Sequence, residues 1–405
     1  MEQKSISAKS IFFLIYLILL ILDNTACQTH EDVVNIYNNI TTGYQKDVFP
    51  HRDQTKPLQL HLQTFPMVIN SFSETEETIS MTMSILCAWK DPQLSWNASS
   101  YGGTWKIVIS SHRIWLPMLY LSNSVEKLHS FGSESEFYAR VTMTGTVYWS
   151  PGDILKAKCP TNIVKFPFDS QTCQFNFTIW GVTDDIVECI SLSRLGNMMF
   201  FTPHSDWKIT MHRQYSYKLS TISIFIFELS MKRQPLYYII IVILPTLTFS
   251  LMNPLVFLLP VESGERVSLG MTILLSYAIF LTLVANSVPA SSNPVCALLL
   301  VMILIMIMSG ITVICVIVCV YYYYIDDISD VHSCLRRLAL CFKRAKSRQY
   351  LESTVSCDQI NVTGKDLIKC LDNVFLIISY MFLVVVLSVY FLYVLRSQSS
   401  GRHTK

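Results

Sequence analysis

The sequence predicts two successive parts, a β-sandwich extracellular domain and a four-helix transmembrane bundle. Two observations predict this fold: apolar and polar residues alternate between about residues 30 and 233, and four long apolar runs follow residue 235. The chain has 405 residues, and its hydrophobic content of 51% suits such a mixed molecule. A net charge of +2 provides no basic face of the kind that binds nucleic acid. No nucleophile, metal or phosphate motif is evident, so we expect neither an enzyme nor a cofactor.

The N-terminal segment has the features of a secretory signal. A short apolar run, residues 11–22, follows Lys4 and Lys9 and precedes small residues near Cys27. This run is too short to cross a bilayer comfortably, so we predict a signal peptide over residues 1–27. Residues 28–235 would then form the exported sandwich domain.

Period-two alternation marks the expected strands. From Ile79 to Trp89 and from Phe137 to Trp149, apolar residues occupy nearly every second position, with Ser, Thr and Arg between them. Such strands have one buried face and one solvated face. A short helix is expected over residues 31–44.

Glycosylation sequons are spread along this domain. Asn39, Asn97 and Asn176 each begin an Asn-X-Ser/Thr triplet, which an exported surface allows to be modified. Asn361 begins a fourth triplet in a segment expected to be cytoplasmic, so it should stay unmodified.

Two cysteines, Cys159 and Cys173, enclose thirteen residues. A disulfide between them would stabilise the fold by about 3 kcal/mol in an oxidising compartment. The enclosed loop carries Phe166, Pro167, Phe168 and Asp169 at its tip. It is either an ordinary closed hairpin or, as we favour above a membrane domain, an interface. Cys87 and Cys189 are either a second pair or buried thiols, and buried thiols are favoured.

An aromatic residue interrupts a polar strand face. In the segment from Cys173 to Trp180, Trp180 falls on the side of Gln174 and Thr178, opposite the apolar residues. An exposed ring there indicates a contact surface or a cation site, and Tyr215 and Tyr217 are spaced to line it. The alternative is that all three rings pack under a loop.

The apolar runs and charges predict a multi-pass topology. Spans are expected over residues 236–259, 266–287, 295–321 and 373–395, with a cytoplasmic loop at 322–372 and an extracellular tail at 396–405. The loop carries eight Lys and Arg residues, the excess typical of the cytoplasmic side. The N-terminal domain would lie outside the plasma membrane.

The second span carries a polar stripe. Its members recur at steps of four, three, four, three and four residues, namely Ser268, Thr272, Leu275, Ile279, Thr282 and Asn286. Several copies around an axis would enclose a wet pore, narrowed by Leu275 and Ile279. Alternatively, the helix packs in a bundle and its hydroxyls bond back to the backbone. The stripe alone favours neither interpretation.

Acidic and basic residues meet at the start of this span. Glu265 lies three residues before Ser268 and so continues the stripe, where a ring of carboxylates would attract cations. Arg266 is turned about 100° away from that line. The charge of the pore mouth depends on which of the two faces the axis.

The motifs together resemble the Cys-loop, or pentameric ligand-gated, ion channels, and within them the cation-selective nicotinic acetylcholine receptor subunits. The resemblance extends from about Glu31 to Leu395. It is carried by the thirteen-residue loop, by Arg233 to Leu236, by Pro245, and by the segment from Gly264 to Ser276. It implies a homo- or heteropentamer whose second spans line a pore, opened by a small cationic agonist such as acetylcholine or another amine. A possible location is the postsynaptic membrane.

The resemblance also implies roles for single residues. Glu265 corresponds to a selectivity ring, Ser268 and Thr272 to narrow polar rings, and Leu275 to the gate. Trp180 corresponds to the Trp that contacts the cation of the ligand. Glu74 and Arg233 resemble an ion pair that joins the sandwich to the first span. The Phe166–Asp169 tip and the segment 287–291, with Pro289, resemble the surfaces that pass motion to the gate.

Several positions depart from the acetylcholine-binding pattern. The tip before the last outer strand lacks adjacent cysteines, Ser122 and Ser84 stand where aromatic residues are expected, and Met118 replaces an Asp. Asn286 replaces an often acidic outer ring. These departures predict either a non-alpha subunit that needs partner subunits or a receptor for a different ligand. The alternative function is an accessory subunit that modulates related subunits without a competent agonist site of its own.

Overall fold

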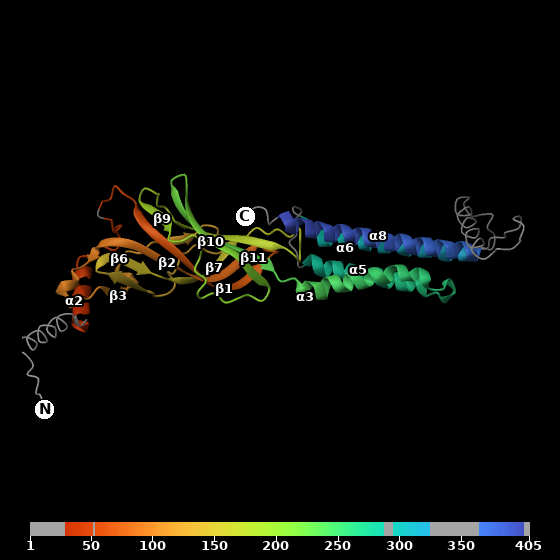
Figure 1. Ribbon diagram of the computed structural model, residues 1–405, viewed down its shortest axis with the longest axis horizontal. Helices are drawn as coiled ribbons and strands as arrows, with labels where there is room; N and C mark the ends of the chain where they lie inside the picture. The colour runs from red at the N-terminus through yellow and green to blue at the C-terminus, as the bar shows by residue number, and fades with distance from the viewer. Residues whose placement is uncertain (1–28, 52, 287–294, 325–363, 401–405) are drawn as a thin grey trace, which may run out of the picture.

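The computed structural model describes residues 29–51, 53–286, 295–324 and 364–400. The β-domain and the helical domain follow one another along the long axis of the molecule (Figure 1). The predicted signal peptide 1–27, Pro289, most of the predicted loop 322–372 and the end of the tail lie outside the described residues.

Two sheets form the β-domain. One has the strand order β3-β5-β6-β2-β1-β9, with β7 also paired to β2, and the other has the order β10-β11-β8-β4. The strands are β1 (Leu58–Ser73), β2 (Thr78–Ser95), β3 (Lys106–Ser110), β4 (Leu119–Leu121), β5 (Tyr138–Thr142), β6 (Thr144–Trp149), β7 (Gly152–Lys158), β8 (Ser170–Ile179), β9 (Val187–Ser191), β10 (Trp207–Leu219) and β11 (Ile222–Arg233).

The apolar faces of both sheets share one core. Met81, Ile85 and Trp89 of β2 lie in the same buried cluster as Phe175 of β8 and Phe227 of β11. Each of these residues is at most 2% exposed. The period-two pattern places them on one face because successive side chains of a strand point to opposite sides.

A short helix closes the N-terminal end of the β-domain. Helix α2 (His30–Thr41) begins with a capping box in which Thr29 and Asp32 satisfy each other's backbone N–H groups. Ile36 and Ile40 bury its apolar stripe in the sandwich core. Two single turns, η1 (Ala98–Ser100) and η2 (Ser111–Arg113), lie between strands.

The first membrane segment changes its helical geometry next to a proline. It runs from Leu236 to Leu258 through α3 (Leu236–Tyr238), η3 (Ile239–Ile243), α4 (Leu244–Met252) and η4 (Asn253–Leu258). The η3 stretch is a π-helix, in which the Leu244 N–H bonds to the Ile239 carbonyl. Pro245 has no N–H to donate, which removes the regular bond at this point and accounts for the widened turn.

Three longer helices complete the membrane domain: α5 (Glu265–Asn286), α6 (Ala297–Tyr323) and α8 (Gly364–Ser400). With the Leu236–Leu258 segment, they are four helices of the described chain that are long and apolar enough to cross a membrane. Ile273 and Tyr277 of α5, Ile305 and Val316 of α6 and Leu383 of α8 share one buried cluster. The predicted fold class is confirmed.

The fourth helix begins earlier than the sequence pattern indicates. We expected a span from residue 373, but α8 starts at Gly364. Leu367, Ile368 and Leu371 are buried there against Val261 of η5 (Val261–Ser263) and Cys319 of α6. This apolar face accounts for the extra helical turns, which polar neighbours conceal in a simple hydropathy reading.

Candidate functional site

Tyr215 and Tyr217 belong to the outer face of the four-stranded sheet, and Trp180 follows directly after the end of β8. Tyr217 pairs with Ile224, and Ile224 pairs with Thr178. Directly paired residues point to the same side of a sheet, so Tyr217 and Thr178 share one face, and Trp180 lies in the turn two residues after Thr178. Trp180 is 64% exposed and Tyr217 is 40% exposed, so no loop among the described residues covers these two rings.

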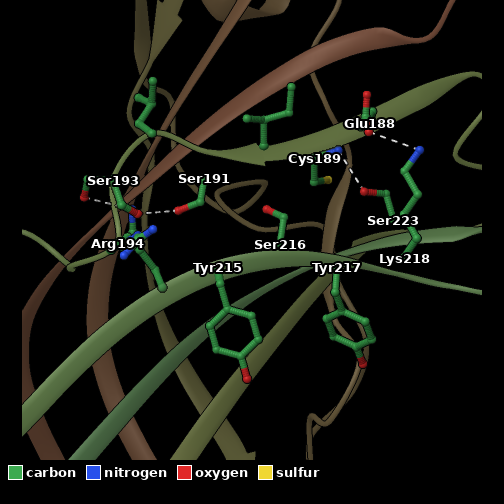
Figure 2. Close-up of a pocket in the computed structure, with 13 residues that line it drawn as sticks. Glu188, Cys189, Ser191, Ser193, Arg194, Tyr215, Ser216, Tyr217, Lys218 and Ser223 are labelled. Carbon is green, nitrogen blue, oxygen red and sulfur yellow. Dashed lines mark hydrogen bonds and ion pairs between the residues drawn. The ribbon is translucent and has the colours of Figure 1, made fainter.

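A pocket of about 500 Å³ lies on the other side of β10. Figure 2 shows Ser216 and Lys218 on the side of β9, while the rings of Tyr215 and Tyr217 point the opposite way. Lys218 Nζ bridges the two strands, at 3.1 Å from Glu188 Oε1. The tyrosine rings and the pocket are therefore on opposite faces of one strand.

A buried carboxylate, that of Glu228, lies on the same face of the sheet as Tyr215 and Tyr217, and sequence reasoning missed it. Glu228 pairs with Tyr215's neighbour Arg213, whose Nε lies 2.6 Å from Oε1, and it accepts a hydrogen bond of 2.8 Å from Gln174 Nε2. Partial burial and the charge of Glu228 raise the pKa of Tyr215. Arg213 neutralises Glu228 and also lies over the Tyr215 ring, 5.7 Å from its centroid, so Trp180 and Tyr217 are the exposed rings near this face that could attract a cation.

The two serines that stand where aromatic residues were expected are hydrogen-bonded within the chain. Ser122 donates a 3.0 Å hydrogen bond to the Asn176 carbonyl, and Ser84 lies 3.0 Å from Ser150 through their hydroxyls. The hairpin between Leu219 and Ile222 has two residues in its turn, of which Ser220 has a φ of +56°. This tip is short.

The sequons differ in their surroundings. Asn39 and Asn97 are exposed on α2 and before η1. Asn176 lies inside β8, half-buried, and its side-chain oxygen is buried without a hydrogen-bond partner. A folded strand between two neighbours disfavours a glycan at Asn176, whereas the other two positions have room for one.

The disulfide loop lies at the boundary between the two domains. Cys159 and Cys173 are bonded with an S–S distance of 2.02 Å, whereas Cys87 and Cys189 are buried free thiols. Phe166 packs against Tyr238 of the first membrane segment, with ring centroids 4.8 Å apart. The disulfide loop also packs in one buried cluster with residues of α5, α6 and α8. Its members are Ile163 and Phe166 of the loop, Val284 of α5, Leu298 and Met302 of α6, and Tyr390 of α8.

Arg233 forms a larger charge cluster than sequence reasoning predicted. Its Nη1 lies 2.6 Å from Glu74 Oε1, and its Nε lies 2.7 Å from Asp169 Oδ1. The rings of Phe166, Trp207 and Tyr238 surround the guanidinium, at 4.3 to 5.3 Å. Burial by itself would lower the pKa of Arg233, but the hydrogen bonds to Asp169 and the charges of both acids raise it.

Helix α5 has one face that no other part of the described chain covers. Its predicted pore residues are all exposed in the single chain: Glu265, Ser268, Thr272, Leu275, Ile279 and Asn286. Leu275 is 62% and Ile279 is 54% exposed, whereas Ile273 and Tyr277 are at most 3% exposed. Thr272 and Thr282 do bond back to backbone carbonyls, yet they remain on the uncovered face.

The adjacent charges at the start of α5 point in different directions. Glu265 is exposed, whereas Arg266 is 3% exposed. Arg266 pairs with Asp372 of α8, with Nη2 2.8 Å from Oδ2. The acid therefore remains on the uncovered stripe, and the base faces the interior of the helical domain.

Comparison with known sequences identifies both parts of this architecture. Residues 33–235 match the neurotransmitter-gated ion-channel ligand binding domain, and residues 242–361 match the neurotransmitter-gated ion-channel transmembrane region. The chain belongs to the neurotransmitter-gated ion-channel family. This is a family of membrane channels and not of enzymes.

Curated members of the neurotransmitter-gated ion-channel family that resemble the chain are acetylcholine receptor subunits. The chain is 29% identical to the delta subunit of Gallus gallus over 303 residues, which cover 68% of this chain and 58% of the relative. It is 28% identical to the alpha subunit of Danio rerio over 65% of this chain and 59% of the relative. A beta-type subunit, lev-1 of Caenorhabditis elegans, is 28% identical over 70% and 55%. The matched part spans about three fifths of these relatives.

Membership in this ion-channel family agrees with a location in the plasma membrane. The family matches cover the β-domain and the segment that contains α5 and α6. The aromatic face thus belongs to the ligand binding domain of the family, and the uncovered face of α5 to its transmembrane region.

Proposed function

We propose that the chain is a subunit of a pentameric, agonist-gated, cation-selective channel. The observation that carries this proposal is the uncovered face of α5, where hydroxyls, two aliphatic side chains and a carboxylate form one line. Such a face in a membrane needs water or further polar surface beside it. Five copies around one axis would supply a shared water column.

The order of residues along this face assigns their roles. Glu265 forms an acidic ring at the cytoplasmic mouth, which raises the local cation concentration. Leu275 and Ile279 form the constriction that closes the channel by excluding water. Ser268, Thr272 and Asn286 provide hydroxyls and an amide to passing hydrated ions.

A small cationic amine, such as acetylcholine, is the proposed agonist. Trp180, directly after β8, and Tyr217 of β10 are exposed, and the face of an aromatic ring attracts an ammonium group. Motion of this sheet would reach the membrane through β11, because Arg233 at its end pairs with Asp169 of the disulfide loop. Ile163 and Phe166 of that loop pack beside Val284 of α5.

Replacement of Glu265 by Gln tests the pore assignment. We expect the ratio of cation to anion permeability to fall, because the variant removes one carboxylate from each copy at the mouth. The measurement is the reversal potential of the agonist-evoked current during dilution of external NaCl. Glu136→Gln is the matched control, because Glu136 is 86% exposed on the β-domain. Equal reversal potentials in the wild-type, Glu265→Gln and Glu136→Gln channels would refute the assignment.

An accessory subunit is the second candidate function. Ser122 and Ser84 leave two positions of the expected aromatic set without a ring, and their hydroxyls are bonded within the chain. Expression of the chain alone and together with related subunits separates the two candidates. Currents evoked by acetylcholine or other amines from the chain alone would support the receptor. Silence alone, with altered currents in the mixture, would support the accessory subunit.

A further inference from the structure

Arg266 is a cation placed beside the proposed conduction path without facing it. It is in the first turn of α5, next to the exposed Glu265, yet it is only 3% exposed. A ring of guanidinium groups at this depth would oppose the acidic ring of Glu265. The direction of the Arg266 side chain therefore decides the net charge of the mouth.

Every contact of the Arg266 guanidinium is directed away from the uncovered stripe. Nη1 donates to Asp372 Oδ1 at 2.9 Å, and Nη2 donates to Asp372 Oδ2 at 2.8 Å, so the pair is bidentate. Nε donates to the Leu259 carbonyl, and Nη2 also donates to the Phe257 carbonyl at 3.2 Å. These carbonyls are neutral.

Asp372 is thus the charged partner that compensates Arg266 within the described chain. Its side chain is 13% exposed, and it belongs to α8, a different helix from the one that carries the stripe. Bidentate pairing fixes both the position and the orientation of a guanidinium. Removal of this carboxylate would leave an uncompensated buried charge, which proteins strongly disfavour.

We propose that Asp372 is a positioning residue for ion selectivity, which acts by holding Arg266 out of the pore mouth. This inference rests on the proposed pore. Without the carboxylate, the long Arg266 side chain turns its charged end toward water. The proposed wet mouth carries Glu265, so the released guanidinium neutralises a carboxylate that would otherwise attract cations.

The start of α8 has further attachments that do not involve Asp372. Lys365 Nζ lies 3.6 Å from Glu262 Oε1 of η5 and 5.3 Å from the ring centroid of Tyr323 of α6. Leu367, Ile368 and Leu371 are buried against η5 and α6. Neutralisation of Asp372 should therefore release Arg266 without detaching the helix.

Asp372→Asn is the decisive variant, measured in the full chain. We expect agonist-evoked single-channel cation conductance to fall by about twofold or more, and the reversal potential under NaCl dilution to shift toward that of chloride. Arg266→Gln should remain cation-selective. In Arg266→Gln/Asp372→Asn, conductance and reversal potential should return to those of Arg266→Gln, because no guanidinium is left to move.

A structural role for Asp372 would give different results. Wild-type conductance and selectivity in Asp372→Asn would overturn the proposal, as would an equal loss of conductance with and without Arg266. Where Asp372→Asn alone does not reach the cell surface, it is co-expressed with the wild-type chain. The proposal then expects channels of stepwise lower conductance, and a single wild-type level overturns it.

The pore proposal and this inference fail in distinguishable ways. If Glu265→Gln leaves the wild-type selectivity unchanged, the pore assignment itself is wrong. If Glu265→Gln lowers cation selectivity but Asp372→Asn behaves as the wild type, only the role of Asp372 is wrong. Asp372→Glu serves as the conservative control, because its carboxylate can still pair with Arg266.

Discussion

Arg233 joins the two domains through one guanidinium group. It is bonded to Asp169 and Glu74 and enclosed by three aromatic rings, and its side chain is 1% exposed. The buried guanidinium is shared by two carboxylates, so the cluster carries a net negative charge. Buried charges are stable only when their hydrogen bonds are well aligned, so the geometry of all three groups is tightly constrained. This cluster connects β11, the disulfide loop and the β1–β2 turn at a single point.

Asp169→Asn should weaken this cluster. We expect the free energy of unfolding to fall by about 3 kcal/mol, the lower end for breaking a buried pair, because Glu74 still compensates Arg233. Thermal melting of the detergent-solubilised chain measures the loss. Asp47→Asn is the control, because Asp47 is an exposed acid without such a cluster. Equal melting temperatures for both variants would contradict the expected role of Asp169.

Leu275→Ser tests the proposed constriction. Leu275 is more exposed than Ile279, the other aliphatic residue of the stripe. A hydroxyl at this position would admit water to the narrow part of the proposed pore. We expect a cation current without agonist, recorded as a resting leak that a pore blocker removes. Leu274→Ser, on the partly buried neighbouring position, is the control. A silent resting membrane in Leu275→Ser channels would count against a gate at this residue.

Some of these residues were predictable and others were not. The stripe from Ser268 to Asn286 follows from helical spacing alone, and its exposure agrees with that spacing. Asp372 was missed because it lies 106 residues after Arg266, in a segment expected to be a loop. An acid directly before the fourth apolar run and a base directly before the second were the available signal, since buried charges need partners.

At the scale of single elements, the pKa of one histidine can be tested. The segment between β4 and β5 is attached to β7 through Asp153, which lies 3.1 Å from His129 Nε2 and accepts from the Gly132 N–H at 3.2 Å. Partial burial would lower the pKa of His129, but the Lys127 carbonyl and the Asp153 carboxylate together raise it. His129 is thus more readily protonated in the folded domain than in the unfolded chain.

The raised pKa of His129 gives a stability that depends on pH. A raised folded pKa stabilises the fold fully below the unfolded pKa, near 6.5 for His, and this contribution disappears as the pH rises through the folded value. Melting temperatures measured from pH 5 to pH 8.5 should therefore fall more for the wild type than for His129→Asn. Parallel pH profiles would contradict this contribution.

Strand pairing decided how well the aromatic face could be predicted. Alternation along β8 placed Trp180 on the polar side, and the two-residue spacing placed Tyr215 and Tyr217 together. The pairing of β8 with β11 and of β11 with β10 was needed to bring Tyr215 and Tyr217 onto the face of Thr178, two residues before Trp180. Register between strands depends on distant side chains, which a single sequence does not reveal.

At the scale of the whole molecule, the order of the two domains and the existence of four spans follow from composition and periodicity. The start of α8 did not, because Lys365, Lys369 and Asp372 interrupt its apolar face in the sequence. In the fold, Lys365 and Asp372 are paired with charged groups of neighbouring segments. A hydropathy window counts these charges as solvent-exposed, whereas tertiary pairing lets the helix extend past them.

In the proposed receptor, the short turn at Ser220 and Thr221 would affect how long an agonist stays bound. Two residues form too small a segment to fold over a ligand beside Trp180 and Tyr217. Dissociation from the proposed site would then not wait for this turn to open, and the rate of unbinding would depend mainly on the contacts of the exposed rings. We expect brief occupancy and a response that ends quickly once transmitter is cleared, at the expense of sensitivity to low concentrations.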